Sequence, residues 1–408
     1  MFAKWKVWLT PYAPYLQQLA LALLAAAIGA VGHWAGVDPK VIERVVEVIK
    51  EVPVPAPAPV KGEAEDAGVH TSGWAPDGTA AARDAALTEF RSFADTPAGK
   101  VGAGELPKQV FLWQAETKLT GKPTPLKDQN PTGACCGFGG TTSIERTLAA
   151  DIVSRNGDPS EFTHFSEEVT YAGSKVQGAR SLGASVSRGD GSAGVFVKAW
   201  VTSVGGMVPK GKYGEYDLTE YDPKRARSWN LSGCPAELLA IAKKFPVKSA
   251  AKVTSWAEAK TALASGYAIM GCASWSYSRT RDANGVAAPT NEGWDHCMSI
   301  DGFYIDPVSG KEFGHVENSW TNLPDRIGNR TGKPYHTGPV GWGNPTTAGF
   351  WASSDSLDRA LRQGDSFAFS GVTGFPAKKL PTDWFIQKHD PDRNRIDRFA
   401  RADFALAY

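Results

Sequence analysis

Residues Lys127–Arg146 have the sequence KDQNPTGACCGFGGTTSIER, in which two adjacent cysteines, the first of them Cys135, follow a short polar stretch. Pro131 and Gly133 are typical of turns and predict that this polar stretch is a loop. After the cysteines, apolar residues recur at helical spacing as far as Ile152. Cys135 is therefore predicted at a helix N-terminus, where the helix dipole and backbone N–H groups lower the pKa of a thiol. This segment alone leaves two roles open, a nucleophile or a small buried apolar side chain.

The composition of the 408-residue chain narrows the classes of protein to which it can belong. With 44 basic and 43 acidic residues, the formal net charge is +1, which is too small to hold a polyanion, so no nucleic-acid partner is expected. The five cysteines contain no Cys-x-x-Cys spacing, and we predict no metal site and no cofactor. Because five is an odd number, at least one thiol stays outside any intramolecular disulfide.

A histidine and an asparagine lie in two predicted strands further along the chain. His296 begins one apolar stretch and Asn318 ends the next, and Asp306–Gly310 between them has the proline and glycine of a turn. The two stretches are therefore predicted to form a β-hairpin, which can bring both side chains together. A cysteine nucleophile needs a base, and the base needs an acceptor that orients it. Cys135, His296 and Asn318 can fill these three roles.

The surrounding residues mix helical and strand patterns, which predicts an α+β domain over residues 106–374. Predicted helices cover residues 141–154, 194–203, 235–244 and 256–264, and predicted strands cover 267–273, 296–305 and 312–318.

Four segments together resemble the papain family of cysteine peptidases, in particular divergent bacterial or phage-borne members. They are Leu106–Val110 with Trp113, Pro123–Gln129 leading to Gly133–Cys135 and Phe138, Trp294–Phe303, and Asn318–Trp320 with Gly341–Gly343 and Gly349–Phe350. The resemblance implies a two-lobed papain-like fold. A helical lobe would carry the nucleophile helix, and an antiparallel, barrel-like β lobe would carry the histidine and the asparagine.

The resemblance also implies a role for each matching residue. Cys135 would attack the scissile carbonyl, His296 would share its proton and later protonate the leaving amine, and Asn318 would orient the imidazole. Gln129, six residues before the nucleophile, would donate its amide to the oxyanion. Trp320 would cover the histidine and the asparagine and keep water from them.

The candidate residues for binding the substrate, a polypeptide, are Gly189, Gly191 and Trp320. Gly189 and Gly191 lie in the sequence Gly-Asp-Gly-Ser, along which an extended peptide could lie if it matches the glycine wall of the family. A plain solvent-exposed loop is the alternative.

Two positions depart from the family pattern. Cys136 stands where the family usually has tryptophan, and Thr132 stands where a disulfide cysteine is common. No paired cysteines match the family's bridges, so we expect packing alone to hold the domain, with Cys272 and Cys297 as small buried core residues. We expect Cys136 to point away from the cleft, because neighbours on a helix diverge by about 100°.

Residues 1–37 are predicted to form a transmembrane anchor. Lys4 and Lys6 precede the apolar run Leu19–Val31, and aromatic residues flank the run on both sides. This pattern favours a single-pass protein that has a membrane as partner and an exported peptidase domain. A cleaved signal peptide, which would release a secreted protein, and a buried core helix are the alternatives.

The remaining segments are predicted to be accessory. Residues 38–105 read as a stalk, a proline-rich linker and a possible pro-segment, and residues 41–52 have the pattern of an amphipathic helix that could self-associate weakly. Residues 60–105 are too short and too glycine-rich to resemble the family's long helical inhibitory pro-segment. Residues 375–408 form a polar C-terminal tail.

The leading expectation is a cysteine endopeptidase with a Cys135–His296–Asn318 triad and an oxyanion hole assisted by Gln129. One alternative is a catalytically inactive papain-like module for binding or structure, for instance in a phage particle. Another is a cell-wall amide hydrolase or acyl transferase that uses the same triad.

Overall fold

The computed structural model of the chain describes residues 73–74 and 90–371, except for 103–105, 123, 126, 130, 187, 282–285, 307–308 and 321–348. The chain divides into two compact units, Met1–Gly68 and Val69–Tyr408, and every described residue belongs to the second. The predicted anchor, the self-association segment 41–52 and the tail 375–408 lie outside the described residues. Among the residues that are described, no helix combines the length and the apolar character needed to cross a membrane.

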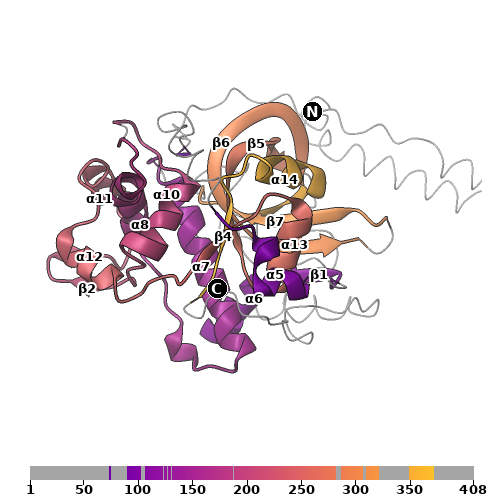
Figure 1. Cartoon of the computed structure of the whole chain (residues 1–408), viewed down its shortest axis with the longest axis horizontal. Helices are drawn as coiled ribbons and strands as arrows, with labels where there is room; N and C mark the ends of the chain where they lie inside the picture. Colours follow the sequence, from indigo (N-terminus) through magenta and orange to yellow (C-terminus); the bar gives the residue numbers. More distant parts are fainter. Residues whose placement is uncertain are drawn as a thin grey trace, which may run out of the picture. The chain divides into compact units, whose positions relative to one another are not determined.

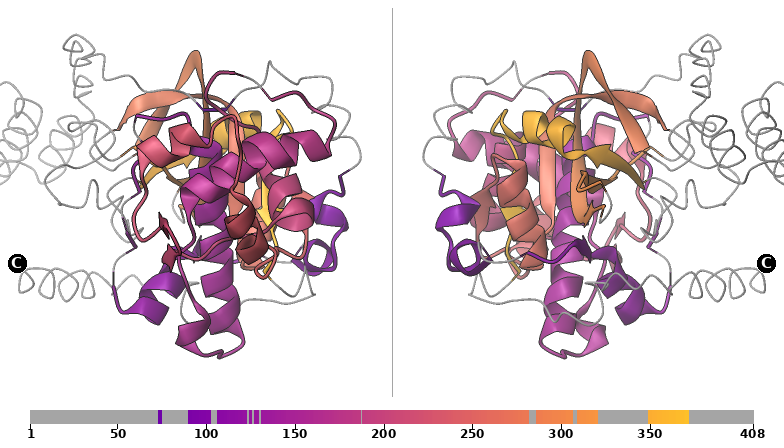
Figure 2. Two further views of the ribbon diagram at one scale, coloured as in Figure 1. Left: turned by 90° about the vertical axis from the view of Figure 1, so that its left-hand side faces the viewer. Right: turned by 90° about the vertical axis from the view of Figure 1, so that its right-hand side faces the viewer.

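The helix that carries Cys135 lies between a group of helices and a sheet. This helix, α7, spans Cys135–Ser154 and packs against α8 and α10 on one side and against β5 and β6 on the other (Figures 1 and 2). The helical group consists of η3 (Pro159–Glu161), α8 (Glu167–Gly173), the π-helical η4 (Ser174–Gly178), α9 (Ala179–Ser181), α10 (Gly194–Ala199), the π-helical η5 (Trp200–Val204), α11 (Pro223–Ser228) and α12 (Ala236–Ala242). A two-stranded ribbon, β2 (Lys212–Tyr213) with β3 (Tyr216–Asp217), accompanies them.

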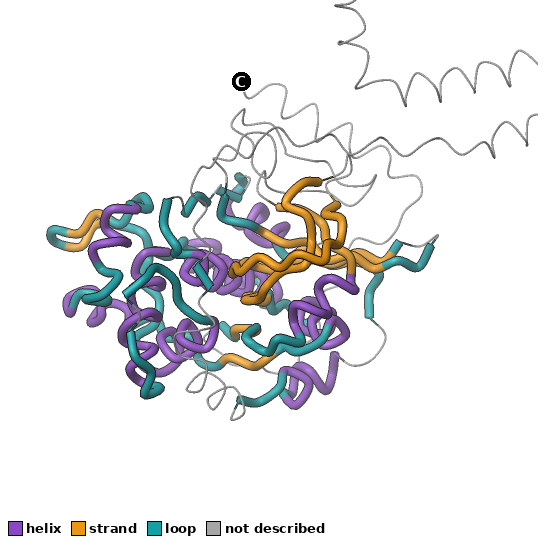
Figure 3. Tube along the Cα trace, turned by 90° about the horizontal axis from the view of Figure 1, so that it is seen from above, coloured by secondary structure: helices purple, strands orange, loops and turns teal. Residues whose placement is uncertain are grey.

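The other part of the unit is a mainly antiparallel sheet, which is separate from the helical group when seen from above (Figure 3). Its strands are β1 (Gln109–Phe111), β4 (Ala250–Lys252), β5 (Ile269–Arg281), β6 (Val286–Ile305), β7 (Glu312–Glu317), β8 (Gly349–Ser353) and β9 (Phe367–Phe369). The order is β4-β9-β5-β6-β7-β8, and β1 pairs with β6. Because β8 pairs with both β6 and β7, these three strands close on one another as in a barrel. The predicted α+β class, with a helical part and a barrel-like β part, is confirmed.

Short helices accompany the sheet. They are η2 (Phe93–Asp95), α5 (Pro97–Gly102), α6 (Trp113–Thr120), α13 (Trp256–Ala264) and α14 (Ser354–Leu361). Phe93 of η2 is completely buried and its ring lies 5.7 Å from that of Tyr267. Residues before position 106 therefore belong to the same packed core as the sheet.

Three glycines let the start of α7 pack closely against its neighbours. A Cβ atom at Gly137 would lie 2.6 Å from the Glu167 carbonyl oxygen, and one at Gly139 would lie 3.1 Å from the backbone of Cys297. The helix begins at Cys135, where the loop before it predicted a helix N-terminus, although the regular helical pattern covers only residues 141–154. Glycine has low helix propensity and weakens the pattern here, whereas contact with α8, α10, β5 and β6 selects glycine at these positions.

A buried network of charges joins α6, α7 and the predicted hairpin. Arg146 of α7 pairs with Glu116 of α6 and with Asp301 of β6 at 3.0 Å. His315 of β7 lies 2.6 Å from the other oxygen of Asp301. Removing one partner from such a group leaves a buried charge unpaired, which costs about 3–5 kcal/mol. The network therefore fixes the hairpin on the nucleophile helix.

The hairpin of β6 and β7 is confirmed, with Ser299 opposite Glu317 and Tyr304 opposite Phe313. The expectation that packing alone holds the domain is wrong. Cys272 of β5 and Cys297 of β6 are opposite each other in the antiparallel pair and form a disulfide. Strand pairing brings the two residues together, and their spacing in the sequence gives no sign of it.

Candidate active site

The candidate nucleophile lies where α7 begins. Cys135 is the first residue of the helix, and Ala134 before it provides no side-chain cap. The backbone N–H groups of the first turn therefore add a positive potential at the sulfur. Cys135 and the candidate base His296 are both completely buried.

The candidate base and its orienting residue meet across β6 and the end of β7. Nε2 of His296 lies 2.9 Å from Oδ1 of Asn318, the first residue after β7. The backbone N–H of Ser319 donates to the same oxygen at 2.7 Å, which fixes the amide. With Nε2 bound to Asn318, Nδ1 is the ring nitrogen that can serve Cys135.

Trp320 lies on the imidazole, as predicted. Its ring centroid is 4.0 Å from that of His296, the interplanar angle is 30°, and the indole is buried. Contact at this distance keeps solvent from one face of the ring and limits its rotation. Trp320 therefore shields the pair formed by His296 and Asn318, which is a role distinct from holding a substrate.

Gln129 is buried in the loop before α7, and its amide has a fixed orientation. Oε1 accepts a hydrogen bond from Ser319 Oγ at 2.6 Å, and Nε2 donates to the Thr132 carbonyl oxygen at 2.8 Å. The Gln129 backbone N–H also donates to the Ser319 carbonyl oxygen at 2.9 Å. An amide nitrogen carries two N–H groups, so Nε2 can donate a second hydrogen bond.

The surroundings of Cys135 favour a thiolate. Burial by itself raises its pKa, but a hydrogen bond with Cys136 and the charge and hydrogen bond of His296 more than offset burial and lower the pKa to about 5. The ordinary value is 9.0. At neutral pH these surroundings therefore favour the thiolate of Cys135, which is the reactive form of a cysteine nucleophile.

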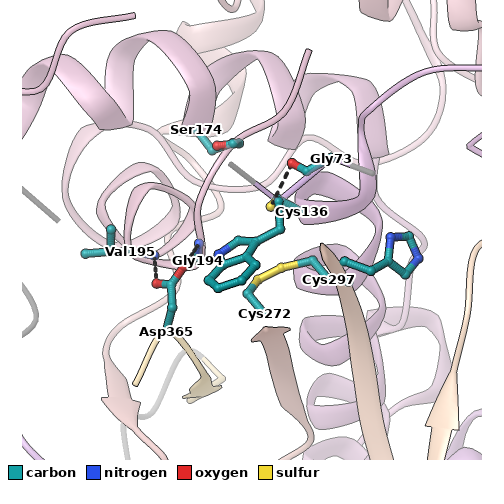
Figure 4. Close-up of a disulfide and its surroundings, with 12 residues drawn as sticks. Gly73, Cys136, Ser174, Gly194, Val195, Cys272, Cys297 and Asp365 are labelled. Atoms are coloured by element: carbon teal, nitrogen blue, oxygen red, sulfur yellow. Dashed lines mark hydrogen bonds between the residues drawn. A yellow bond between two sulfur atoms is a disulfide. The ribbon is translucent and has the colours of Figure 1, made fainter. Parts of the chain in front are cut away.

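Cys136 does not point away from the cleft as expected. Its Sγ lies 3.6 Å from the carbonyl oxygen of Gly73 (Figure 4). The same thiol also interacts with Cys135. Burial and the charge of Cys135 raise the pKa of Cys136. The small side chain, where the resembled family has tryptophan, leaves room for residues 73–74 beside it.

Among the residues that the structure describes, two groups of side chains have the spacing of metal ligands, and each has another structural explanation. Cys272 and Cys297, which lie near Cys136, are joined in the disulfide. Asp301, which lies near Glu317, pairs with His315 and with Arg146.

The predicted substrate stretch is anchored to the nucleophile loop. Nζ of Lys175 donates to the carbonyl oxygens of Gly189 at 2.5 Å and Gly191 at 3.0 Å, and burial lowers the pKa of this lysine to about 8. Asp190 accepts a hydrogen bond from the Gly133 backbone N–H at 3.1 Å. Through Asp190 the stretch is therefore hydrogen-bonded to the backbone of Gly133, two residues before Cys135.

A two-residue segment from the predicted linker lies over the nucleophile. Gly73 accepts a hydrogen bond from the Ser192 backbone N–H at 2.8 Å, and Trp74 forms a parallel bridge with Ser192. A Cβ atom at Gly73 would overlap the Gly133 carbonyl oxygen and lie 2.9 Å from Cys135 Sγ. Sequence reasoning missed this segment, because neither glycine nor tryptophan in a linker signals a long-range contact.

No protein-family model and no curated protein matches the chain. Solved structures with a similar backbone include xylellain, a cysteine protease from Xylella fastidiosa, at 16% identity and TM-score 0.47 over 74% of this chain and 97% of that chain. They also include the bromelain protease from Ananas comosus in complex with the E64 inhibitor, at 15% identity and TM-score 0.41 over 65% and 99%. A third is the clostridial cysteine protease Cwp84, at 18% identity and TM-score 0.42 over 62% and 57%. At TM-scores below 0.5 these likenesses do not decide the function, which we infer from the geometry of the site.

The low pKa of Cys135 predicts an unusual pH dependence of its alkylation. The thiolate fraction should fall only as the pH drops through about 5, because the neighbours of Cys135 lower its pKa to that value. Replacing Cys136 with alanine removes one of these neighbours, so the midpoint should move to higher pH. The measurement is the rate of iodoacetamide modification of Cys135 between pH 4 and 10, followed by mass spectrometry of the peptide.

The matched control for this experiment is Cys234→Ala. Cys234 is a buried free thiol whose pKa burial raises to about 12, and it should not affect the profile. A midpoint near the ordinary thiol value in the unaltered chain would contradict the thiolate assignment.

Proposed function

We propose that the chain is a papain-like cysteine endopeptidase that hydrolyses peptide bonds through Cys135, His296 and Asn318. The observation that carries the proposal is the position of Cys135 at the start of α7, hydrogen-bonded to His296, whose Nε2 lies 2.9 Å from Asn318 Oδ1. Nucleophile, base and orienting acceptor are thus joined by hydrogen bonds, which is the arrangement that covalent catalysis by cysteine requires.

In the acylation step the Cys135 thiolate attacks the scissile carbonyl carbon. A C–S bond forms and the carbonyl π electrons move to oxygen. The backbone N–H of Cys135 and the amide of Gln129 would stabilise this oxyanion. When the oxyanion collapses, the C–N bond breaks and the His296 imidazolium gives its proton to the leaving amine.

In the second half of the reaction a water molecule hydrolyses the thioester. His296 takes a proton from the water as hydroxide attacks the acyl carbon, and the C–S bond breaks to release the carboxylic acid. The thiolate and the imidazolium are then restored. Asn318 holds the imidazole through both halves, and Trp320 limits access of solvent to it.

Mass spectrometry of the intact chain after treatment with an epoxysuccinyl inhibitor tests the proposal. A thiolate opens the epoxide, and we expect one adduct, mapped to Cys135, at neutral pH. Cys135→Ala should remove both the adduct and casein hydrolysis. Cys234→Ala, which deletes a buried thiol of raised pKa, should leave both unchanged.

If Cys135 forms no adduct even when residues 73–74 have been displaced from it, this result contradicts the peptidase proposal and favours an inactive binding module. An adduct with hydrolysis of peptidoglycan but not of casein would instead favour a cell-wall amide hydrolase.

A further inference from the structure

A free thiol lies against the disulfide that joins β5 to β6. The Sγ atoms of Cys136, Cys272 and Cys297 all lie within 4.8 Å of one another (Figure 4). Cys272 and Cys297 are bonded to each other, whereas Cys136 is free. All three residues are completely buried, so the surrounding protein shields them from thiols in solution. The thiol that is placed to react with this disulfide therefore belongs to the chain itself.

The backbone of α7 lies directly on the strand that carries Cys297. A Cβ atom at Gly139 would lie 3.1 Å from the carbonyl carbon of Cys297 and 3.1 Å from the amide nitrogen of Met298. Gly139 follows Cys136 by three residues, so the two residues share one face of the helix. The close approach at Gly139 thus brings the thiol of Cys136 to the Cys297 end of the disulfide.

We propose that Cys136, Cys272 and Cys297 form a disulfide-exchange site, in which Cys136 replaces Cys272 as the partner of Cys297. The Cys136 thiolate attacks Sγ of Cys297, a new S–S bond forms, and the bond to Cys272 breaks. The electron pair leaves with Sγ of Cys272, which takes up the proton that Cys136 has lost. One thiol and one disulfide are present before and after, so the step needs neither an oxidant nor a reductant.

The exchanged disulfide would join the residues that follow the nucleophile and the base. Cys136 is the residue after Cys135, and Cys297 is the residue after His296. The new bond would link α7 to β6, whereas the bond in the structure links β5 to β6. Exchange therefore moves the covalent link from within the sheet to a position between the sheet and the nucleophile helix. The exchange itself does not depend on the proposed peptidase function.

Two acidic groups hold Cys136 in its thiol form. Burial, the hydrogen bond and the charge of Cys135, and the charge of Asp365 raise the pKa of Cys136 well above the ordinary value of 9.0. The Tyr171 hydroxyl and the Lys175 ammonium also interact with the charge of Cys136. Because only the thiolate attacks a disulfide, exchange should be slow at neutral pH and become faster as the pH rises toward this pKa.

Asp365 is fixed in its position near Cys136. Its completely buried carboxylate accepts hydrogen bonds from the backbone N–H groups of Gly194 and Val195 and from Nε1 of Trp74, each at 2.8 Å. Trp74 is only 7% exposed and belongs to the same apolar cluster as the three cysteines of the exchange site. The charge that acts on Cys136 is therefore held in place by three hydrogen bonds.

Disulfide mapping of the full chain at alkaline pH tests the proposal. The chain is incubated at pH 9.5 without added thiol, quenched in acid, unfolded, treated with N-ethylmaleimide and digested with pepsin. Mass spectrometry should find a disulfide between Cys136 and Cys297 and, in equal amount, maleimide on Cys272. Both should form about tenfold faster for each unit of rise in pH.

Cys135→Ala gives a sharper comparison at a single pH. It removes the hydrogen bond and the charge that raise the pKa of Cys136, so exchange should become about tenfold faster for each unit by which that pKa falls. Cys234→Ala is the matched control, because Cys234 is also a buried free thiol but lies outside the group of three sulfur atoms, and it should not change the rate. Cys136→Ala should release no Cys272.

A second measurement leaves Cys136 and Cys297 as the remaining pair. The Cys272→Ala chain is refolded with glutathione disulfide, which is reduced to two molecules of glutathione as the two thiols are oxidised. Most refolded chains should contain a disulfide between Cys136 and Cys297. Refolded chains in which both residues are still free overturn the exchange site.

The mapping has two outcomes that overturn the proposal. If Cys272 stays unlabelled at pH 9.5 in both the unaltered and the Cys135→Ala chains, no exchange takes place. If Cys136 is instead bonded to Cys272 and Cys297 is released, the link from α7 to β6 is wrong. Either result leaves the peptidase proposal standing, because epoxide labelling of Cys135 tests that proposal separately.

Discussion

Replacing Gly73 with alanine should raise the rate of peptide hydrolysis and of Cys135 alkylation by about 10- to 100-fold. The added methyl group would overlap the backbone oxygen of Gly133 and come within 2.9 Å of Cys135 Sγ. Backbone atoms of the nucleophile loop cannot move aside as a flexible side chain can, so the segment at residues 73–74 must leave the cleft. The thiol would then be open to substrate and reagent.

Stopped-flow alkylation and hydrolysis of a quenched peptide measure this effect. Gly371→Ala is the matched control, because a Cβ atom there would have its nearest neighbour, an Asp151 oxygen, at an ordinary 3.8 Å. If Gly73→Ala and Gly371→Ala behave alike, residues 73–74 do not obstruct the cleft, and the burial of Cys135 needs another explanation.

Replacing Gln129 with alanine should lower kcat by about 100- to 1,000-fold, which is the usual cost of losing one oxyanion donor. The amide is fixed at both ends, by Ser319 Oγ and by the Thr132 carbonyl oxygen, so it is oriented before substrate arrives. KM should change little, because the donor acts on charge that develops only in the transition state.

Steady-state kinetics compare the Gly73→Ala chain, which is the parent, with the chain that carries both Gly73→Ala and Gln129→Ala. Gln363→Ala is the control. The Gln363 amide is likewise hydrogen-bonded at both ends, to the backbone N–H and the carbonyl oxygen of Ser274, but it lies beside a surface strand. A Gln129→Ala chain whose kcat stays within about threefold of its parent would remove Gln129 from the oxyanion site.

The sequence contained most of the information for the proposed catalytic residues and little for the residues that cover them. Cys135, His296 and Asn318 could be predicted because a helix start and a hairpin are local patterns, and the β6–β7 hairpin is where it was expected. The contacts of Trp74 with Ser192 and Asp365 join residues more than a hundred positions apart. No periodic pattern in the sequence reveals such contacts, so residues 38–105 were interpreted as a stalk, a linker and a possible pro-segment.

The same limit applies to the disulfide and to Asp365. Cys272 meets Cys297 because of the register of β5 on β6, and a shift of one residue would separate them. Asp365 lies in the short connection between α14 and β9, where an acidic residue is common on a surface. Only the tertiary structure places it against the first residues of α10 and the indole of Trp74.

The disulfide between Cys272 and Cys297 makes the support of His296 depend on the redox state of the surroundings. Cys297 is the next residue after His296, so in an oxidising compartment the strand that carries the base is covalently joined to β5. In a compartment that keeps thiols reduced, only backbone pairing and side-chain packing would hold β6 to β5. The same polypeptide would then hold its proposed general base by a covalent bond in one location and by non-covalent contacts in another.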